Sequence, residues 1–130
     1  MVHHPNVYAD LLGKKIDEVD AKCWLVNTGW TGGPYGVGKR MHLPYTRAMV
    51  NEALAGMLDN VETTEEPIFG LHIPKSVPNV PNEVLNPRDT WSDKSAYDKQ
   101  ASELAAKFAE NFKKYAEGTE DAICKAGPKG

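Results

Sequence analysis

The chain has 130 residues, enough for one domain with one hydrophobic core. Hydrophobic residues make up 41% and charged residues 25%, which excludes a collagen-like, disordered or disulfide-scaffold protein. The net charge of −3 comes from acidic and basic residues interspersed along the chain, so no nucleic-acid-binding or polybasic membrane-binding surface is indicated. No apolar run could span a bilayer, and residues 1–5 lack the pattern of a secretory signal peptide.

Helical spacing of apolar residues predicts a helix over residues 5–20, with Asn6 as its N-cap. A compact apolar run, Cys23–Val26, predicts a strand over residues 21–28 that is buried on both faces, as in an α/β or mixed sheet. Residues 29–38 contain five glycines and predict a loop with positive φ angles or close approaches, followed by a short extended segment over 39–43. The apolar stripe of the first helix comprises Tyr8, Leu11, Leu12, Ile16 and Val19.

The second half of the chain is predicted to alternate between helices and a proline-rich stretch. Pro44 favours the start of a helix over residues 46–57, with Gly56 near its end. Residues 59–87 hold five prolines and predict one strand at 68–73 in a segment that otherwise runs over the surface. A long helix is expected over 91–117 and a short one over 120–126. Their expected caps and stop are Ser92 or Asp93, Thr119 and Gly118, and the long helix carries an apolar stripe of Tyr97, Ala101, Leu104, Ala105, Phe108, Phe112 and Tyr115.

The glycine-rich stretch fits part of a phosphate-binding P-loop, because residues 33–39 read G-x-x-x-x-G-K. A P-loop would need Ser or Thr next, where Arg40 stands, and then a helix, which Pro44 disfavours at Leu43. The stretch is therefore interpreted as a turn without function or as a mobile loop that contacts a ligand in another way. Arg40 offers a planar charged group for phosphate or a base, and the Thr46 hydroxyl either caps a helix or meets a ligand, with capping favoured by the residues alone.

No pattern in the sequence predicts a catalytic residue or a metal ligand. His42 and His72 have no carboxylate or cysteine at metal-ligand spacing, and no Ser-His-Asp arrangement can be identified. Cys23 and Cys124 are interpreted as two reduced thiols of a cytosolic protein, and their lack of CxxC spacing disfavours a zinc or redox site.

Three ordered blocks, residues 21–30, 36–41 and 45–49, resemble the LVNTGW…GKR…TRA signature of ATP-dependent phosphoenolpyruvate carboxykinases. Further stretches similar to that family are residues 4–9, 67–71, 78–81 and 85–91, so the resemblance covers nearly the whole chain. It implies that residues 1–130 are a single C-terminal fragment of the family's mononucleotide-binding domain. The implied fold class is α/β, with a mixed sheet and flanking helices.

The resemblance also implies a reaction, in which oxaloacetate and ATP give phosphoenolpyruvate, CO2 and ADP with the help of magnesium and manganese in the cytoplasm. It implies that Arg40, Met41 and Thr46 contact the nucleotide, and it favours ligand contact over capping alone for Thr46. The family's kinase-type P-loop, its metal ligands and its oxaloacetate-binding arginine have no counterpart in these residues. Catalytic and metal-binding residues are therefore expected to be absent, and this chain alone is expected to be inactive.

We therefore expect a part of such an enzyme that supplies one wall of a site for ATP with magnesium, while oxaloacetate and manganese bind only in the longer enzyme. Two alternatives stay open: a stand-alone nucleotide-binding or regulatory module, and an inert structural fragment. Exposed apolar surface, from residues 23–26 especially, predicts self-association. The resemblance assigns no role to the insert at residues 32–36.

Overall fold

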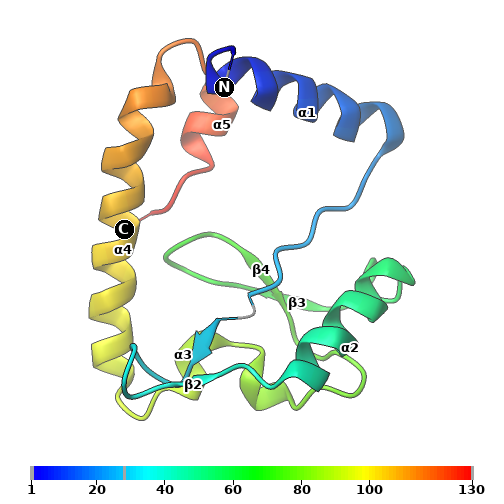
Figure 1. The fold of residues 1–130 in the computed structure, drawn as a ribbon, viewed down its shortest axis with the longest axis vertical. Coiled ribbons are helices and arrows are strands. Elements are labelled where there is room, and N and C mark those ends of the chain that lie inside the picture. The colour runs from blue at the N-terminus through cyan, green and yellow to red at the C-terminus, as the bar shows by residue number, and fades with distance from the viewer. Residues whose placement is uncertain (1, 28, 130) are drawn as a thin grey trace.

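The computed structural model describes residues 2–27 and 29–129, which form an open frame of helices and two small hairpins (Figure 1). Helices α1 and α4 meet at one corner of the frame, and α2 and the hairpins lie on the opposite side from α1. The elements are α1 (Pro5–Val19), β1 (Trp30–Thr31), β2 (Lys39–Arg40), α2 (Leu43–Leu54), β3 (Thr63–Glu65), β4 (His72–Pro74), the 3₁₀ helix η1 (Asn82–Val84), α3 (Pro87–Thr90), α4 (Lys94–Ala116) and α5 (Asp121–Lys125).

The strands form two separate antiparallel hairpins. Strand β1 pairs with β2, with Trp30 opposite Arg40, and β3 pairs with β4, with Thr64 opposite Ile73. The described residues are mostly helical with two small antiparallel sheets, so the predicted combination of helices and strands is present, whereas the expected mixed sheet is not formed by these residues. A mixed sheet needs parallel neighbours joined by crossovers, and these hairpins pair only strands that are close in sequence.

The strand predicted over residues 21–28 is also wrong for its described part. Residues 21–27 form neither helix nor strand, and Thr28 lies outside the described residues. Leu25 is 84% exposed, whereas Trp24 and Val26 are half-buried. A strand exists only where neighbours satisfy its backbone groups, and no described strand pairs with this run. The buried indole N–H of Trp24 likewise has no acceptor within the described part of the chain.

The lower half of the frame in Figure 1 holds α2, the two hairpins and α3. Its core comes mainly from the proline-rich stretch, residues 59–87. Leu58, Val77 and Val80 are buried, and residues including Trp24 and Tyr45 pack around them. Val77 and Val80 form an isolated antiparallel bridge, which turns both side chains inward. The expectation that this whole stretch runs over the surface is therefore wrong at its centre.

The strand predicted at 68–73 is displaced toward the C-terminus. Residues 67–69 form a turn, and β4 begins only at His72. The Glu66 carboxylate causes the displacement, because its Oε2 accepts hydrogen bonds from the backbone N–H groups of Ile68 (3.0 Å) and Phe69 (2.6 Å). These bonds hold the apolar residues in a turn rather than a ladder.

Helix α1 has nearly the predicted extent, but its N-cap is His4, whose Nδ1 accepts from the backbone N–H of Asn6. The Asn6 amide instead donates to the Tyr115 and Glu117 carbonyl oxygens (both 3.1 Å) and to Thr119 Oγ1 (3.2 Å). We call this set of three hydrogen bonds the Asn6 clasp. It joins the start of α1 to the end of α4.

The other helices begin and end close to their predicted positions, with two caps reassigned. Helix α2 starts three residues earlier than expected, with His42 as N-cap, so Thr46 lies inside the helix and does not cap it. Asp93 caps α4, and Gly118 follows it at φ 79°, both as predicted. Thr119 does not cap α5, because its hydroxyl donates to the Tyr115 carbonyl.

The C-terminal residues tie the upper and lower parts of the frame together. The backbone N–H of Lys129 donates to the Ile68 carbonyl (2.7 Å), and its ammonium group pairs with Glu65 (2.8 Å). The hydrogen bond raises the pKa of Lys129 and lowers that of Glu65. Residues 126–129 therefore link α5 to the turn of the β3–β4 hairpin.

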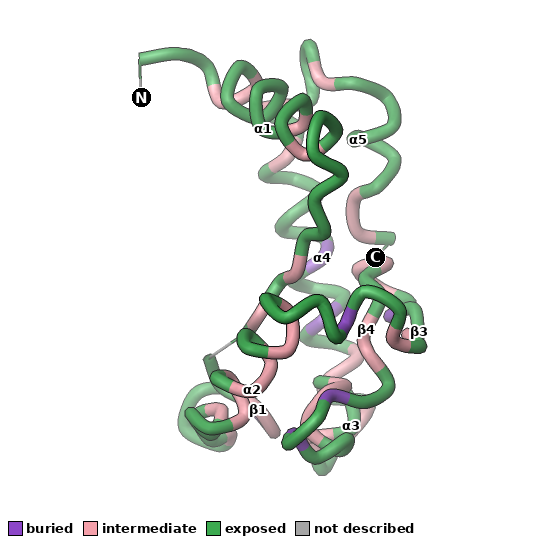
Figure 2. Tube along the Cα trace, turned by 90° about the vertical axis from the view of Figure 1, so that its right-hand side faces the viewer, coloured by how far each residue is buried: buried purple, intermediate pink, exposed green. Residues whose placement is uncertain are grey.

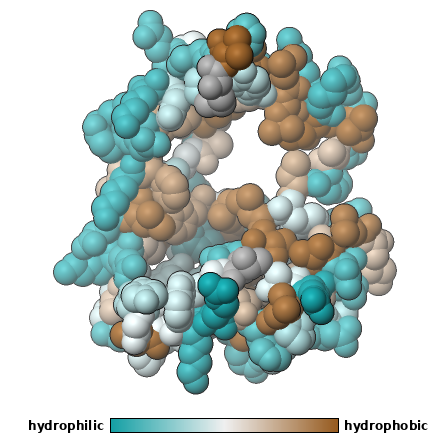
Figure 3. Space-filling model, in the orientation of Figure 1, coloured by the Kyte–Doolittle hydropathy of each residue, from teal (hydrophilic) through white to brown (hydrophobic). Residues whose placement is uncertain are grey.

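The frame exposes far more surface than a compact protein of its size. Its accessible area is 9713 Å² for a mass of 14.3 kDa, whereas a folded monomer of that mass exposes about 6,800 Å². Buried stretches are few and short (Figure 2), and the space-filling view is open between α1 and the lower half (Figure 3). The apolar stripe of α1 exists but is not covered, since Leu12 and Val19 are exposed. The expected self-association through such surfaces stays a prediction.

Replacing Asp93 by alanine is expected to unwind the first turn of α4. Asp93 Oδ1 accepts from the Ser95 hydroxyl (2.6 Å) and from the backbone N–H groups of Ser95 and Ala96. These bonds hold the pKa of Asp93 below its ordinary value, the Ser95 hydroxyl contributing most. The cap's stabilisation is thus present above the unfolded aspartate pKa of about 3.9, and is lost as the pH falls through the lower folded value.

Helix content measured by circular dichroism from pH 6 down to pH 2 tests this prediction. The matched control is Ser92→Ala, because Ser92 is the neighbouring exposed residue that the sequence allowed as an alternative cap. Equal loss of helix in both variants, or the same acid transition in the Asp93→Ala chain as in the parent, would contradict the assignment.

Candidate functional site

The three predicted nucleotide-contacting residues lie within residues 40–46, which run from the end of β2 into the first turns of α2; we call this stretch the β2–α2 connection. Arg40 ends β2, opposite Trp30. The backbone N–H of Met41 donates to the Gly29 carbonyl (2.9 Å), which continues the hairpin pairing by one residue. Thr46 sits in the first turns of α2, with its N–H bonded to the His42 carbonyl (3.3 Å). The hairpin and the helix therefore fix the backbone of this connection at both ends.

The side chains on this connection have unused bonding capacity. Arg40 is exposed, and within residues 2–27 and 29–129 its guanidinium has neither a hydrogen-bond partner nor an ion-pair partner. Met41 and Thr46 are half-buried, and the Thr46 hydroxyl makes no hydrogen bond to a described residue. A free guanidinium can bind an anion through its fork of N–H donors or lie flat against a π-system.

The glycine-rich turn before Arg40 is tightly folded. Gly32, Gly33 and Gly36 have positive φ angles of 78°, 153° and 90°, as the sequence predicted for this stretch. A Cβ added to Gly38 would lie only 2.4 Å from the Gly33 carbonyl oxygen, so two backbone segments cross there. The carbonyl of Pro34 accepts from the N–H groups of residues 37 and 38, which closes the turn.

This geometry differs from that of a P-loop. Strand β2 rather than a helix follows the glycine-rich turn, so no helix N-terminus faces a phosphate site at this point. The rejection of the P-loop interpretation is confirmed. One contact was not predicted: the N–H of Gly32 donates to Thr90 Oγ1 (3.0 Å). Because Thr90 is 58 residues away, no local sequence signal could have revealed this anchor.

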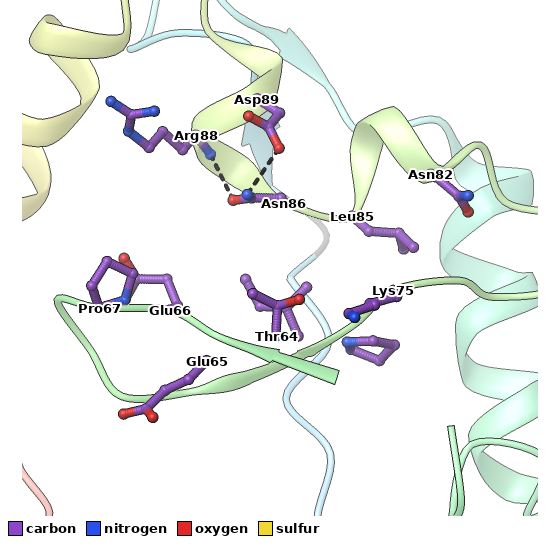
Figure 4. Close-up of a pocket in the computed structure, with 12 residues that line it drawn as sticks. Thr64, Glu65, Glu66, Pro67, Lys75, Asn82, Leu85, Asn86, Arg88 and Asp89 are labelled. Carbon is purple, nitrogen blue, oxygen red and sulfur yellow. Dashed lines mark hydrogen bonds between the residues drawn. The ribbon is translucent and has the colours of Figure 1, made fainter. Parts of the chain in front are cut away.

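A separate hollow of about 430 Å³ lies between the β3–β4 hairpin and the η1–α3 segment (Figure 4). Its charged groups are already paired. Arg88 binds Asp98 through two hydrogen bonds of 2.7 and 2.9 Å, which raise the pKa of Arg88 and lower that of Asp98, and Lys75 pairs with Glu62. Arg40, Met41 and Thr46 do not line this hollow. We take the β2–α2 connection as the candidate site, because the Arg40 guanidinium has no partner among the described residues, whereas the charged groups of the hollow are paired.

The described residues contain no group of three or more His, Cys, Asp and Glu side chains that could hold a metal ion. Cys23 and Cys124 are both exposed and free. None of the helices described is long and apolar enough to cross a membrane.

Comparison with known proteins gives these features a context. Residues 1–83 match the protein family described as phosphoenolpyruvate carboxykinase. Phosphoenolpyruvate carboxykinase (ATP) of Caldanaerobacter subterraneus subsp. tengcongensis is 61% identical over 126 residues, which are 97% of this chain and 24% of that protein. The corresponding protein of Lysinibacillus sphaericus is 59% identical over 95% of this chain and 23% of its own length. That of Thermus thermophilus is 55% identical over 97% of this chain and 24% of its own length.

A family match over more than half of the chain and this level of identity place the chain among the phosphoenolpyruvate carboxykinases. The chain belongs to the ATP-dependent phosphoenolpyruvate carboxykinase family. It spans about a quarter of the length of the curated relatives that it matches. The resemblance seen in the sequence is thereby confirmed.

Proposed function

We propose that this chain supplies the nucleotide-contacting edge of the ATP site in a carboxykinase that converts oxaloacetate and ATP to phosphoenolpyruvate, CO2 and ADP. The observation that carries the proposal is the free guanidinium of Arg40 on a backbone fixed by β2 and α2, in a chain whose relatives are named phosphoenolpyruvate carboxykinase (ATP). The chain then acts as part of that protein's nucleotide-binding domain.

Each residue of the connection has a distinct role in this proposal. Arg40 offers positive charge and a planar face to the nucleotide. Met41 offers a polarizable apolar surface, and its backbone N–H donates to the Gly29 carbonyl, which holds the peptide between Arg40 and Met41 in place. Thr46 offers a hydroxyl that no described residue uses. Together they bind and orient the nucleotide without taking part in bond breaking.

The chemistry itself falls to other parts of the protein. Phosphoryl transfer requires cradled phosphates and metal ions that neutralise the developing charge. The described residues do not fit that task, because they form no metal-binding cluster and no P-loop, so we derive no step through magnesium or manganese here. Those ions and oxaloacetate would bind to the remaining three quarters of such a protein. The same polypeptide would cover the exposed apolar stripe of α1 and residues 21–27.

The test uses a full-length carrier, defined as the Caldanaerobacter subterraneus relative in which this chain replaces the matched 126 residues. The carrier is expected to form phosphoenolpyruvate from oxaloacetate and ATP. In the carrier, Arg40→Ala is expected to raise the KM for ATP about tenfold or more, since a charge-assisted hydrogen bond contributes about 1.5–3 kcal/mol. Steady-state kinetics with ATP as the varied substrate measures this change.

Lys107→Ala is the charge-matched control, because Lys107 is an exposed cation on α4 outside the connection. It should leave the KM for ATP within twofold of the parent carrier. An Arg40→Ala carrier with unchanged KM for ATP would contradict the proposal. The proposal would also be contradicted if the carrier folds but forms no phosphoenolpyruvate, whereas the unmodified relative, with its own segment, does.

A further inference from the structure

The β1–β2 hairpin exposes two aromatic rings next to Arg40. Trp30 and Arg40 are directly opposite each other in the antiparallel pair, so their side chains leave the same face of the hairpin, with Cβ atoms about 5 Å apart. The ring of Tyr35, at the turn, meets Trp30 edge-on, with centroids 5.3 Å apart and planes at 84°. One face of the hairpin thus carries an indole, a phenol and a guanidinium.

Both rings keep exposed surface beyond their contact with each other. Tyr35 is 84% exposed and Trp30 47% exposed, although both stand on a turn that is held rigidly. The turn is fixed by the close crossing at Gly38 and by the hydrogen bond from Gly32 to Thr90. The described residues contain no stacking contact between the Arg40 guanidinium and either ring, so all three planar groups remain available.

We propose that Trp30 and Tyr35 form an aromatic wall that stacks on the base of the bound nucleotide, beside the contact made by Arg40. This inference rests on the proposed function, which places a nucleotide at Arg40. A nucleobase presents two π-faces, and aromatic side chains bind such faces largely irrespective of the base. The perpendicular arrangement of the two rings lets one ring stack while the other meets the edge of the base.

A fixed aromatic wall also explains why the insert at residues 32–36 is rich in glycine. The positive φ angles of Gly32, Gly33 and Gly36 let the chain reverse sharply around Pro34, which brings Tyr35 back against Trp30. The ligand class is therefore a nucleoside triphosphate recognised through its base. Its phosphates extend away from the hairpin toward the remaining polypeptide.

Calorimetric titration of the full-length carrier with two probes, ATP and inorganic tripolyphosphate, tests the wall. Tyr35→Ala is expected to raise the Kd for ATP about 5- to 50-fold, because a base–aromatic stack is lost. The Kd for tripolyphosphate, which has no base, should stay within twofold. Tyr35→Phe keeps the ring and should bind ATP within twofold of the parent. Trp30→Leu should repeat the selective loss for ATP.

The outcomes separate this inference from the proposed function. If Tyr35→Ala and Trp30→Leu leave the Kd for ATP unchanged while Arg40→Ala raises it, the aromatic wall is overturned and the proposed function stands. An equal loss for both probes also overturns the wall, because it shows a general loss of the site. If Arg40→Ala leaves the binding of both probes unchanged as well, both proposals fail.

Discussion

Gly38→Ala is expected to open the β1–β2 hairpin and to lower the thermal stability of the chain. The new Cβ would lie 2.4 Å from the Gly33 carbonyl oxygen and 2.8 Å from the Thr31 carbonyl oxygen. Both neighbours are backbone atoms that cannot rotate away, so the strands must separate. Overpacking of this kind costs about 1–3 kcal/mol or more.

Near-ultraviolet circular dichroism follows the opening, because the Trp30–Tyr35 ring pair sits on this hairpin. The matched control is Gly13→Ala within α1, where an added Cβ meets no atom within 4 Å. That substitution should stabilise the helix by about 0.5–1 kcal/mol, because alanine is the better helix former. A Gly38→Ala chain with the parent's aromatic signal and melting temperature would show that the crossing relaxes without cost.

Asn6→Ala is expected to release α1 from the rest of the frame. The Asn6 amide has two N–H donors for the three acceptors of the clasp, so the clasp contributes about 1–3 kcal/mol in all, and two of its acceptors are carbonyls at the end of α4. Since α1 has no buried residue, little apolar packing would hold it once the clasp is lost. Hydrogen exchange of the α1 amides should accelerate by a factor of ten or more, while α4 keeps its protection at Ala101 and Ala105.

Asn51→Ala provides the matched control, because Asn51 is an exposed asparagine on α2 whose side chain bonds to no described residue. It should leave exchange in α1 unchanged. Protection of α1 that persists in the Asn6→Ala chain would mean that other contacts hold this helix in place.

The helices could be predicted because their determinants are local. The Asp93 cap and the positive φ of Gly118 act within one turn of the ends of α4, and helical spacing defines its buried alanines. The N-cap of α1 was misassigned although a local signal existed. Pro5 occupies the first turn, and proline at that place favours the preceding residue, His4, as the cap.

The sheet could not be predicted, because strands depend on partners that are distant in sequence. Residues 23–26 have the composition of a buried strand, and composition does not show whether neighbours are present. For the site, adjacency in sequence was enough to bring Arg40, Met41 and Thr46 onto one connection. The anchor of the glycine-rich turn at Thr90 was not predictable, because it spans 58 residues. The nucleotide contacts themselves stay predictions.

The Asn6 clasp also bears on the order in which the frame folds. Its partners are 109 to 113 residues away along the chain, so closing it confines almost the whole polypeptide into one loop. The entropy of closing such a loop costs about 4 kcal/mol, which exceeds the about 1–3 kcal/mol that the two N–H donors of Asn6 return. Closure therefore becomes favourable only after α4 and the lower half have already shortened the distance between the two ends. We therefore expect the clasp to form last and to open first, so that the docking of α1 is a late, reversible step in the folding of this chain.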